Sequence, residues 1–318
     1  MPKREADGTV TWAFRAARHI ALGLVLVVFT GCSLSQLTTD QTASLLATGS
    51  VALDRESDLV FARDAMPASL KTLETFLINS PNNQDLLFLL TKGFNAYALL
   101  FLEGDLEKAR LEGTEREVES LNRRAVLHYL RARTYGFILL NYVELEEAAL
   151  SGDLEALGKA LEGLQKDDVP ALFWTTQAWA SAINLSQDDP DMVGALPVVE
   201  KMMRRVMKLD GNYLAGSPYI FMGSFFASRP RMFGGDPDEA KKYFQTALER
   251  YGEVNLLVPY MFGRLYAVQV QDRALFNNMM AKVLEAEVTE HPDFRLQNEA
   301  ARERARFWVD HVDDLFFE

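Results

Sequence analysis

Apolar residues recur at helical spacing along most of the chain, and this pattern predicts helices rather than strands. Leu70, Leu73 and Leu77 share one helix face. A longer apolar stripe runs from Leu121 to Tyr142, and another runs from Trp308 to Phe316. The strict alternation expected of half-buried strands is nearly absent. The pattern therefore predicts an all-α protein.

Prolines mark where several of these helices begin and end. Asp189-Pro190, Ser217-Pro218 and Asp236-Pro237 each place a good N-cap residue before a proline at the first helical position. Ser80-Pro81 and Arg229-Pro230 fit helix ends, because the residue before a proline is pushed out of the helical region. These signals and the length of the chain predict roughly ten to twelve helices.

The segment DPDEAKKYFQTALERYG, Asp236 to Gly252, carries the most informative local pattern. Ala240, Phe244 and Ala247 resemble the second helix of a tetratricopeptide repeat, in which small residues let a neighbouring helix approach. The Lys-Leu-Asp-Gly-Asn ending of Val199–Tyr213 resembles the turn that closes such a repeat. The two Asp-Pro helix starts lie further apart than the usual repeat of about 34 residues. We therefore expect stacked helical hairpins in a degenerate tetratricopeptide-like array.

The N-terminus has the layout of a signal peptide: basic residues, then an apolar run, then small residues. The run from Ile20 to Thr30 is shorter than the roughly 20 residues of a transmembrane helix. Phe29-Thr30-Gly31-Cys32 resembles a bacterial lipobox, which is cut before a cysteine that carries diacylglycerol. An ordinary secretory signal and an uncleaved anchor are the alternatives. We expect a covalent lipid on Cys32, the chain's single cysteine.

The expected organisation has three parts. Residues 1–31 form the signal peptide, residues 32–50 form a lipid-anchored tether rich in Ser, Thr and Gln, and residues 51–318 form the helical domain. Ser33 stands where an inner-membrane retention signal would resemble Asp. We therefore expect the protein in the bacterial cell envelope, anchored to the outer membrane and facing the periplasm.

Composition and missing motifs exclude several classes of function. A formal net charge of -12 and the lack of a long basic run argue against nucleic-acid binding. His128, His291 and His311 share no metal-ligand spacing with one another or with a cysteine, which excludes a usual zinc site. The chain has no GxSxG elbow, no phosphate-binding GxxxxGK[ST] and no GxGxxG after a strand. We expect no enzymatic activity, no metal and no cofactor beyond the lipid.

Two features of the apolar helices could be structural or functional. Leu86–Leu102 is apolar nearly all round, interrupted by Lys92 and Asn95. A buried central helix is favoured over a membrane span, because a lysine in mid-membrane is costly. The same helix could line a hydrophobic groove with Lys92 and Asn95 as its polar points. His128 lies on an apolar stripe, and we favour a buried packing role over a functional one.

Two arginine-containing segments are candidate surfaces. Ser120–Arg133 places four arginines on one helix, and a solvated, locally paired face is favoured over a docking surface for an acidic partner. Tyr219–Asp236 combines five aromatic residues with Arg229, Arg231 and two glycines. Aromatic residues beside arginines are typical of interface hot spots, but also of a packed helix followed by a turn. Both interpretations of this segment remain open.

With these residues in view, the chain resembles the T component of TRAP (tripartite ATP-independent periplasmic) transporters, from about Met66 to Leu315. The resemblance rests on the following segments: SLKTLETFLINSPNNQDLLFLLTKGFNAYALLFLE, LHYLRARTYGFILL, DVPALFWTTQAWA, PRMFGGDPDEAKKYFQTAL, YAVQVQDRALFNNMMAKVLE and ARERARFWVDHVDDLF.

The resemblance implies a tetratricopeptide-like lipoprotein without enzymatic activity that associates with a periplasmic solute-binding protein. It also implies a homo-trimer around a central passage, and a hydrophobic cleft that hands on a small apolar ligand. The alternatives are a scaffold lipoprotein in envelope assembly and a carrier that binds apolar ligands by itself. Candidate contact residues come from the most recognisable motifs and from the apolar helix: Arg229, Arg231, Phe233, Gln271, Asp272, Arg273, Lys92 and Asn95.

Overall fold

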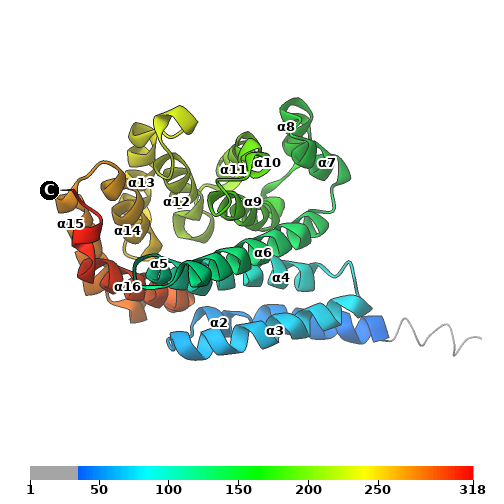
Figure 1. Cartoon of the computed structure of the whole chain (residues 1–318). Coiled ribbons are helices and arrows are strands. Elements are labelled where there is room, and N and C mark those ends of the chain that lie inside the picture. The colour runs from blue at the N-terminus through cyan, green and yellow to red at the C-terminus, as the bar shows by residue number, and fades with distance from the viewer. Residues whose placement is uncertain (1–34, 318) are drawn as a thin grey trace, which may run out of the picture.

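The computed structural model describes residues 35–317, and every regular element in that range is a helix (Figure 1). The predicted all-α class is confirmed. The α-helices are residues 35–49, α2 (Val51–Asp54), α3 (Leu59–Asn79), α4 (Gln84–Tyr97), α5 (Glu103–Glu112), α6 (Glu115–Leu140), α7 (Val143–Ser151), α8 (Leu154–Gly163), α9 (Val169–Asn184), α10 (Pro190–Gly194), α11 (Leu196–Asp210), α12 (Tyr213–Ala227), α13 (Pro237–Tyr251), α14 (Leu257–Met261), α15 (Arg273–Glu285) and α16 (Arg295–Asp310). Two π-helical segments, η1 (Ala98–Leu102) and η4 (Phe262–Ala267), continue α4 and α14, and short 3-10 turns are η2 (Lys166–Asp168), η3 (Arg231–Phe233), η5 (Val288–Glu290), η6 (Pro292–Phe294) and η7 (Val312–Asp314).

The long helix α6 lies at the centre of the molecule. It packs against α4 on one side and α9 on the other, and α3 covers the outer side of α4 (Figure 1). From α9 the chain continues through α11 to the α12–α13 pair, and α14, α15 and α16 close the C-terminal end. The helix α16 also contacts η1 and α2, so the C-terminal helix packs against the N-terminal part of the described chain.

The proline signals placed helix boundaries correctly. Asp189 and Asp236 are N-caps whose side chains accept backbone N–H bonds, with a proline at the first helical position. In α12 the backbone is non-helical at positive φ from Leu214 to Gly216, and regular helix resumes at Ser217-Pro218. The helices α3 and α12 end at Asn79 and Ala227, just before Ser80-Pro81 and Arg229-Pro230.

The apolar segment 86–102 forms the buried helix that we expected. It belongs to a continuous helix, Gln84–Glu112, which in the described part of the chain is the one long and apolar enough to cross a membrane. Of its most apolar window, 61% is buried inside the protein. Leu86, Leu90 and Phe94 are at most 2% exposed. Burial against neighbouring helices accounts for its hydrophobicity.

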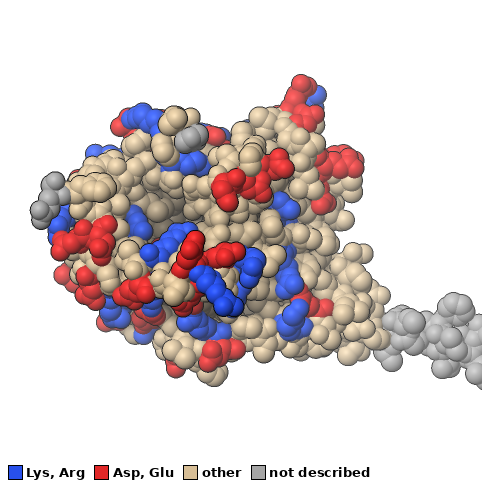
Figure 2. All heavy atoms as spheres, viewed as in Figure 1, with Lys and Arg blue, Asp and Glu red and all other residues tan. Residues whose placement is uncertain are grey.

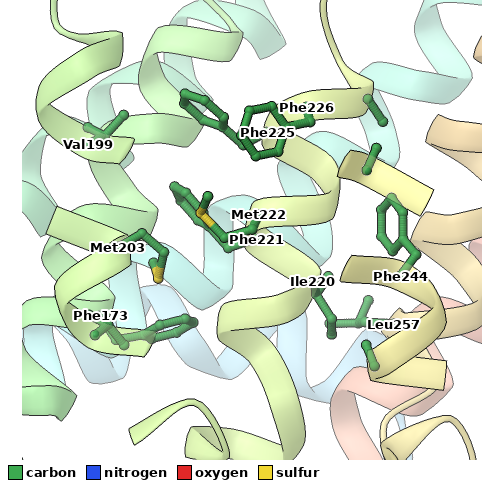
Figure 3. Close-up of a cluster of buried hydrophobic side chains, with 14 of the residues drawn as sticks. Phe173, Val199, Met203, Ile220, Phe221, Met222, Phe225, Phe226, Phe244 and Leu257 are labelled. Carbon is green, nitrogen blue, oxygen red and sulfur yellow. The ribbon is translucent and has the colours of Figure 1, made fainter. Parts of the chain in front are cut away.

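The predicted close approach at Ala240, Phe244 and Ala247 is also confirmed. All three side chains are fully buried where α13 packs on α12. A Cβ atom built on Gly223 of α12 would lie 2.9 Å from the Phe244 ring, so only glycine fits there. Figure 3 shows α12 between Met203 of α11 on one side and Phe244 on the other. Whether the hairpins form a regular repeat stays a prediction.

The predicted tether differs from expectation within its described part. Residues 35–49 form a helix, and Thr42 Oγ1 donates to the carbonyl one turn earlier at 2.8 Å, which fits a hydroxyl residue into a helix. The Asp40 carboxylate accepts hydrogen bonds from Ser80 Oγ and Asn83 Nδ2, both at 2.6 Å. This helix is therefore fastened to the end of α3.

The predicted signal peptide and the predicted lipid site, Cys32, lie outside the described residues. Both stay predictions.

Candidate functional site

A cavity of about 460 Å³ opens between α5, α9, α12, α14 and α16. Its volume lies in the range of about 300–1,000 Å³ that is typical of small-molecule sites. Figure 2 shows the hollowed face of the molecule, with Lys and Arg side chains at its edge. The cavity is thus large enough for a small organic molecule.

The helix α12 supplies the longest wall of this cavity. Phe221 and Phe225 line it, with Ser217, Ser224 and Ser228 on the same helix face at spacings of three, four and seven residues. This face therefore combines two aromatic rings with three hydroxyl groups. Phe173 of α9 and Leu257 of α14 extend the apolar surface, and both are buried. An apolar ligand would contact rings and aliphatic side chains here.

A buried ion pair forms another part of the wall and joins α5 to α16. Arg304 donates to the Glu107 carboxylate from Nε at 2.9 Å and from Nη2 at 2.7 Å. Its Nη1 donates to the Leu99 carbonyl at 3.3 Å. Trp308 Nε1 and the Tyr260 hydroxyl also donate to Glu107, each at 3.2 Å. Both oxygens of this carboxylate therefore accept hydrogen bonds, and its charge is paired inside the protein.

The pKa values of the two glutamates of this wall are shifted in opposite directions. Burial by itself raises the pKa of Glu107, but the charge and hydrogen bonds of Arg304 outweigh burial and hold that pKa below its ordinary value. Burial raises the pKa of Glu103, which lies 3.9 Å from Arg304 and accepts a hydrogen bond from the Tyr129 hydroxyl. Arg304 thus keeps Glu107 charged while Glu103 is shifted toward its neutral form.

Two further arginines line the cavity without a carboxylate partner. The Arg229 guanidinium lies 3.8 Å from the centre of the Phe225 ring, and its Nη2 donates to the Phe225 carbonyl. Burial lowers the pKa of Arg229 to about 10, with Glu200 acting weakly in the other direction. Arg264 lies 3.9 Å from the centre of the Trp308 ring. Across residues 35–317, neither arginine forms an ion pair, and the Nε atom of each is buried without a hydrogen-bond partner.

Of the predicted contact residues, Arg229 lies on the cavity wall. Arg231 and Phe233, which follow it in the chain, are not among the residues that line the cavity. Arg231 is exposed on the loop and pairs with Asp238 at 2.9 Å. Phe233 ends the short turn Arg231–Phe233, and its side chain lies outside what the structure describes. The loop therefore connects a cavity residue to an exposed charged surface.

The predicted candidates Gln271, Asp272 and Arg273 hold the C-terminus of the chain and lie away from the cavity wall. Gln271 Nε2 donates to the Leu315 carbonyl at 3.2 Å, and Asp272 caps the start of α15. Arg273 forms an ion pair with Asp313. Their observed contacts are structural.

Lys92 and Asn95, the expected polar points of a groove, also lie outside the cavity wall. Lys92 pairs with Asp54 of α2 at 2.7 Å. Asn95 is fully buried and its Nδ2 donates to the Trp174 carbonyl of α9 at 3.2 Å. These contacts fasten α4 to its neighbours, as the favoured core-packing interpretation expects, and a role of either residue in ligand or partner contact stays a prediction. The cavity is reached instead by Leu99 and the residues of α5.

His128 has the packing role that we favoured. Its ring lies 5.5 Å from both Phe94 and Tyr97, stacked on the first and edge-on to the second. Burial is the largest cause that lowers the pKa of His128. On the same helix, Arg131 lies over Phe94 and Arg133 over Trp179 at 5.0 Å each, which leaves a partly packed, partly solvated basic face.

The sequence analysis missed the Arg304–Glu107 pair. A signal for Arg304 was present, because it precedes Trp308 by four residues and so falls on the apolar stripe of the last helix. A charged residue on an apolar stripe points to a buried partner. Nothing in the local sequence identified Glu107 as that partner.

The fold and the cavity define an all-helical protein suited to binding a small molecule. Within the described residues, no group of His, Cys, Asp and Glu side chains could hold a metal ion. A family model described as TRAP transporter T-component matches residues 55–316, and the chain belongs to this family. A protein of Treponema pallidum (strain Nichols) described as "Uncharacterized protein" is 24% identical over 266 residues, which cover 83% of this chain and 82% of that protein.

Family membership confirms the resemblance seen in the sequence. It gives the protein an accessory role in a TRAP transport system and indicates a location in the bacterial envelope. The family is one of transporter subunits and not of enzymes.

Proposed function

We propose that this protein is a lipid-anchored accessory subunit that binds the periplasmic solute-binding protein of a TRAP system and passes on a small hydrophobic ligand. The observation that carries the proposal is the cavity of about 460 Å³, whose wall includes aromatic and aliphatic side chains. All its lining residues fall within the family match at 55–316, so the cavity belongs to the part of the chain that is similar to the family. Apolar walls favour a ligand that loses water on entry, by roughly 25 cal/mol for each Å² buried.

The loop that follows α12 is the surface that we propose for the solute-binding protein. Met232 is 82% exposed. It directly follows Arg231, which pairs with Asp238, and it lies three residues after the cavity residue Arg229. An exposed large apolar side chain beside an arginine is typical of an interface anchor. A partner bound at this loop would stand next to the cavity and could receive its ligand.

Sedimentation velocity tests this proposal directly. The mature chain with Cys32→Ser, which lacks the lipid, is run alone and mixed with the solute-binding protein of its own system. We expect a trimer alone and a heavier species on mixing. The Met232→Asp substitution should weaken the complex by roughly tenfold or more, as loss of an interface anchor does.

The matched control is Ile78→Asp on α3, because Ile78 is also an exposed apolar residue, at 79%. This variant should bind the partner normally. If the protein associates with no TRAP solute-binding protein, the proposed partner is wrong. The alternative of a scaffold lipoprotein in envelope assembly would then be favoured.

The proposed lipid anchor has its own test. Cell fractionation of the natural chain should place it in the outer membrane, with a mass on the N-terminal peptide that corresponds to acylated Cys32. The Cys32→Ser variant should lose both the added mass and the mature cleavage. An unmodified Cys32 in a cleaved protein would contradict the anchor and favour an ordinary secretory signal.

A further inference from the structure

The charged residues of the cavity are not balanced. Its wall carries four arginines, Arg110, Arg229, Arg264 and Arg304, against two glutamates, Glu103 and Glu107. The rest of the molecule has the opposite character, since the whole chain has a formal net charge of -12. Positive charge thus exceeds negative charge on the wall of this cavity. Low-dielectric walls strengthen the field in such a cleft.

Of these four arginines, Arg304 alone forms an ion pair among the described residues. The Arg304 guanidinium donates its hydrogen bonds to the Glu107 carboxylate and the Leu99 carbonyl. Arg229 and Arg264 each stack flat on an aromatic ring, at 3.8 Å from Phe225 and 3.9 Å from Trp308. Stacking on an aromatic face leaves the edge of a guanidinium, with its N–H donors, free to meet an anion.

Arg229 and Arg264 are half-buried, and among the described residues neither has a carboxylate within ion-pair distance. Burial lowers the pKa of Arg229 to about 10, because part of its guanidinium has lost its contact with water. A guanidinium in such a place is stabilised by a nearby counter-charge. An anionic ligand group in the cavity would supply that charge to the terminal N–H donors of both residues.

We infer that the ligand is an amphipathic organic anion, whose charged head meets Arg229 and Arg264 and whose apolar body lies against Phe221, Phe225 and Leu257. The inference rests on the proposed ligand-carrying function and narrows its ligand from any small apolar molecule to one with a negative head. The head is a group such as a carboxylate, which accepts two parallel N–H bonds from one guanidinium.

Three probes with the same ten-carbon chain separate the head from the body. Calorimetric titration of the mature Cys32→Ser chain uses decanoate, 1-decanol and decyltrimethylammonium, each below its aggregation concentration. Decanoate should bind at least roughly tenfold more tightly than decanol, because charged hydrogen bonds add to the shared apolar burial. The cationic probe should bind more weakly than decanol. This comparison needs no substitution, so it does not depend on the folding of any variant.

Substitutions then assign the head to its residues. Arg229→Gln and Arg264→Gln should each weaken decanoate binding by roughly tenfold and leave decanol within about twofold. The control is Arg231→Gln, because Arg231 lies two residues from Arg229 but is exposed and paired with Asp238. It should change neither affinity.

The possible failures are distinguishable. Equal binding of decanoate and decanol would overturn the anionic head and leave the proposed hydrophobic ligand standing. Preferential binding of the cation would overturn the head as well. Binding of none of the probes would overturn both the ligand part of the proposed function and this inference. Association with the solute-binding protein is measured separately and would be unaffected.

Discussion

The Arg304→Ala substitution should destabilise this protein far more than the loss of a surface arginine. The Arg304 side chain is 6% exposed and its partner Glu107 is 15% exposed, so water screens the pair little. Removing the guanidinium deletes two charge-assisted hydrogen bonds and leaves a buried carboxylate with only the neutral donors Trp308 and Tyr260. Breaking a buried pair in this way costs about 3–5 kcal/mol.

Urea denaturation followed by helical circular dichroism measures this cost as a change in the free energy of unfolding. The control, Arg231→Ala, removes an arginine that is 66% exposed and should cost about 1 kcal/mol or less. Glu107→Ala alone should also be destabilising, because it deletes the same two hydrogen bonds and leaves Arg304 with only the more distant Glu103 carboxylate, at 3.9 Å. The double substitution should cost clearly less than the sum of the two, since neither member of the pair then remains without the other.

The same pair has a pH signature with a definite sign. Arg304 holds the pKa of Glu107 below its ordinary value despite burial, so the stability that it contributes is present above the unfolded pKa. That contribution is lost as the pH falls through the folded pKa. Without Arg304, burial alone raises the pKa of Glu107, so the variant should recover stability relative to the natural protein on acidification. An Arg304→Ala variant as stable as Arg231→Ala, or single effects that simply add, would refute this reasoning.

Two further predictions address packing and a histidine. Gly223→Val should cost about 1–3 kcal/mol or more in thermal or urea unfolding, because a Cβ atom there meets the buried Phe244 ring at 2.9 Å. Gly194→Ala, where nothing lies within 4 Å, should change stability little, and equal effects of the two would contradict the close-approach argument. His311 should titrate by NMR above the ordinary pKa of about 6.5, because its ring bonds the Phe307 carbonyl. Its contribution to stability is present below the unfolded pKa and is lost as the pH rises through the folded pKa, so a folded pKa below 6.5 would disprove the sign.

Local chemistry explains why the helix boundaries could be predicted. An Asp-Pro pair such as Asp236-Pro237 specifies both the N-cap acceptor and the first helical φ within two residues. The spacing of Ala240, Phe244 and Ala247 likewise lies within one helix and predicts which face is closely packed. Each signal is complete without knowledge of the rest of the fold. The Ser- and Thr-rich composition of the expected tether did not indicate the helix at residues 35–49. Ser and Thr disfavour a helix only weakly, and the contacts of this helix with the end of α3 lie outside the local sequence.

The cavity could not be predicted in this way, because its wall is assembled from distant segments. Arg304 and Glu107 are 197 residues apart in the chain. The apolar helix 86–102 is hydrophobic nearly all round, so its pattern does not indicate which side meets a cavity. Lys92 and Asn95 were therefore plausible groove residues, although they face α2 and α9. Arg229 was a candidate because it follows the aromatic residues of Tyr219–Asp236, and aromatic residues beside arginines are typical of interface hot spots.

The position of the first described helix bears on how the proposed handover would work. The described part of the first helix starts at residue 35, three positions after the cysteine that we propose as the lipid anchor, and Asp40 fastens this helix to the end of α3. A chain spans at most about 3.6 Å for each residue, so the anchor gives the body little reach. The body that carries the cavity and the Arg231–Met232 surface would therefore be held at the membrane by its N-terminal end. In this arrangement the solute-binding protein is the component that travels, and the anchored subunit is the fixed point at which it exchanges ligand.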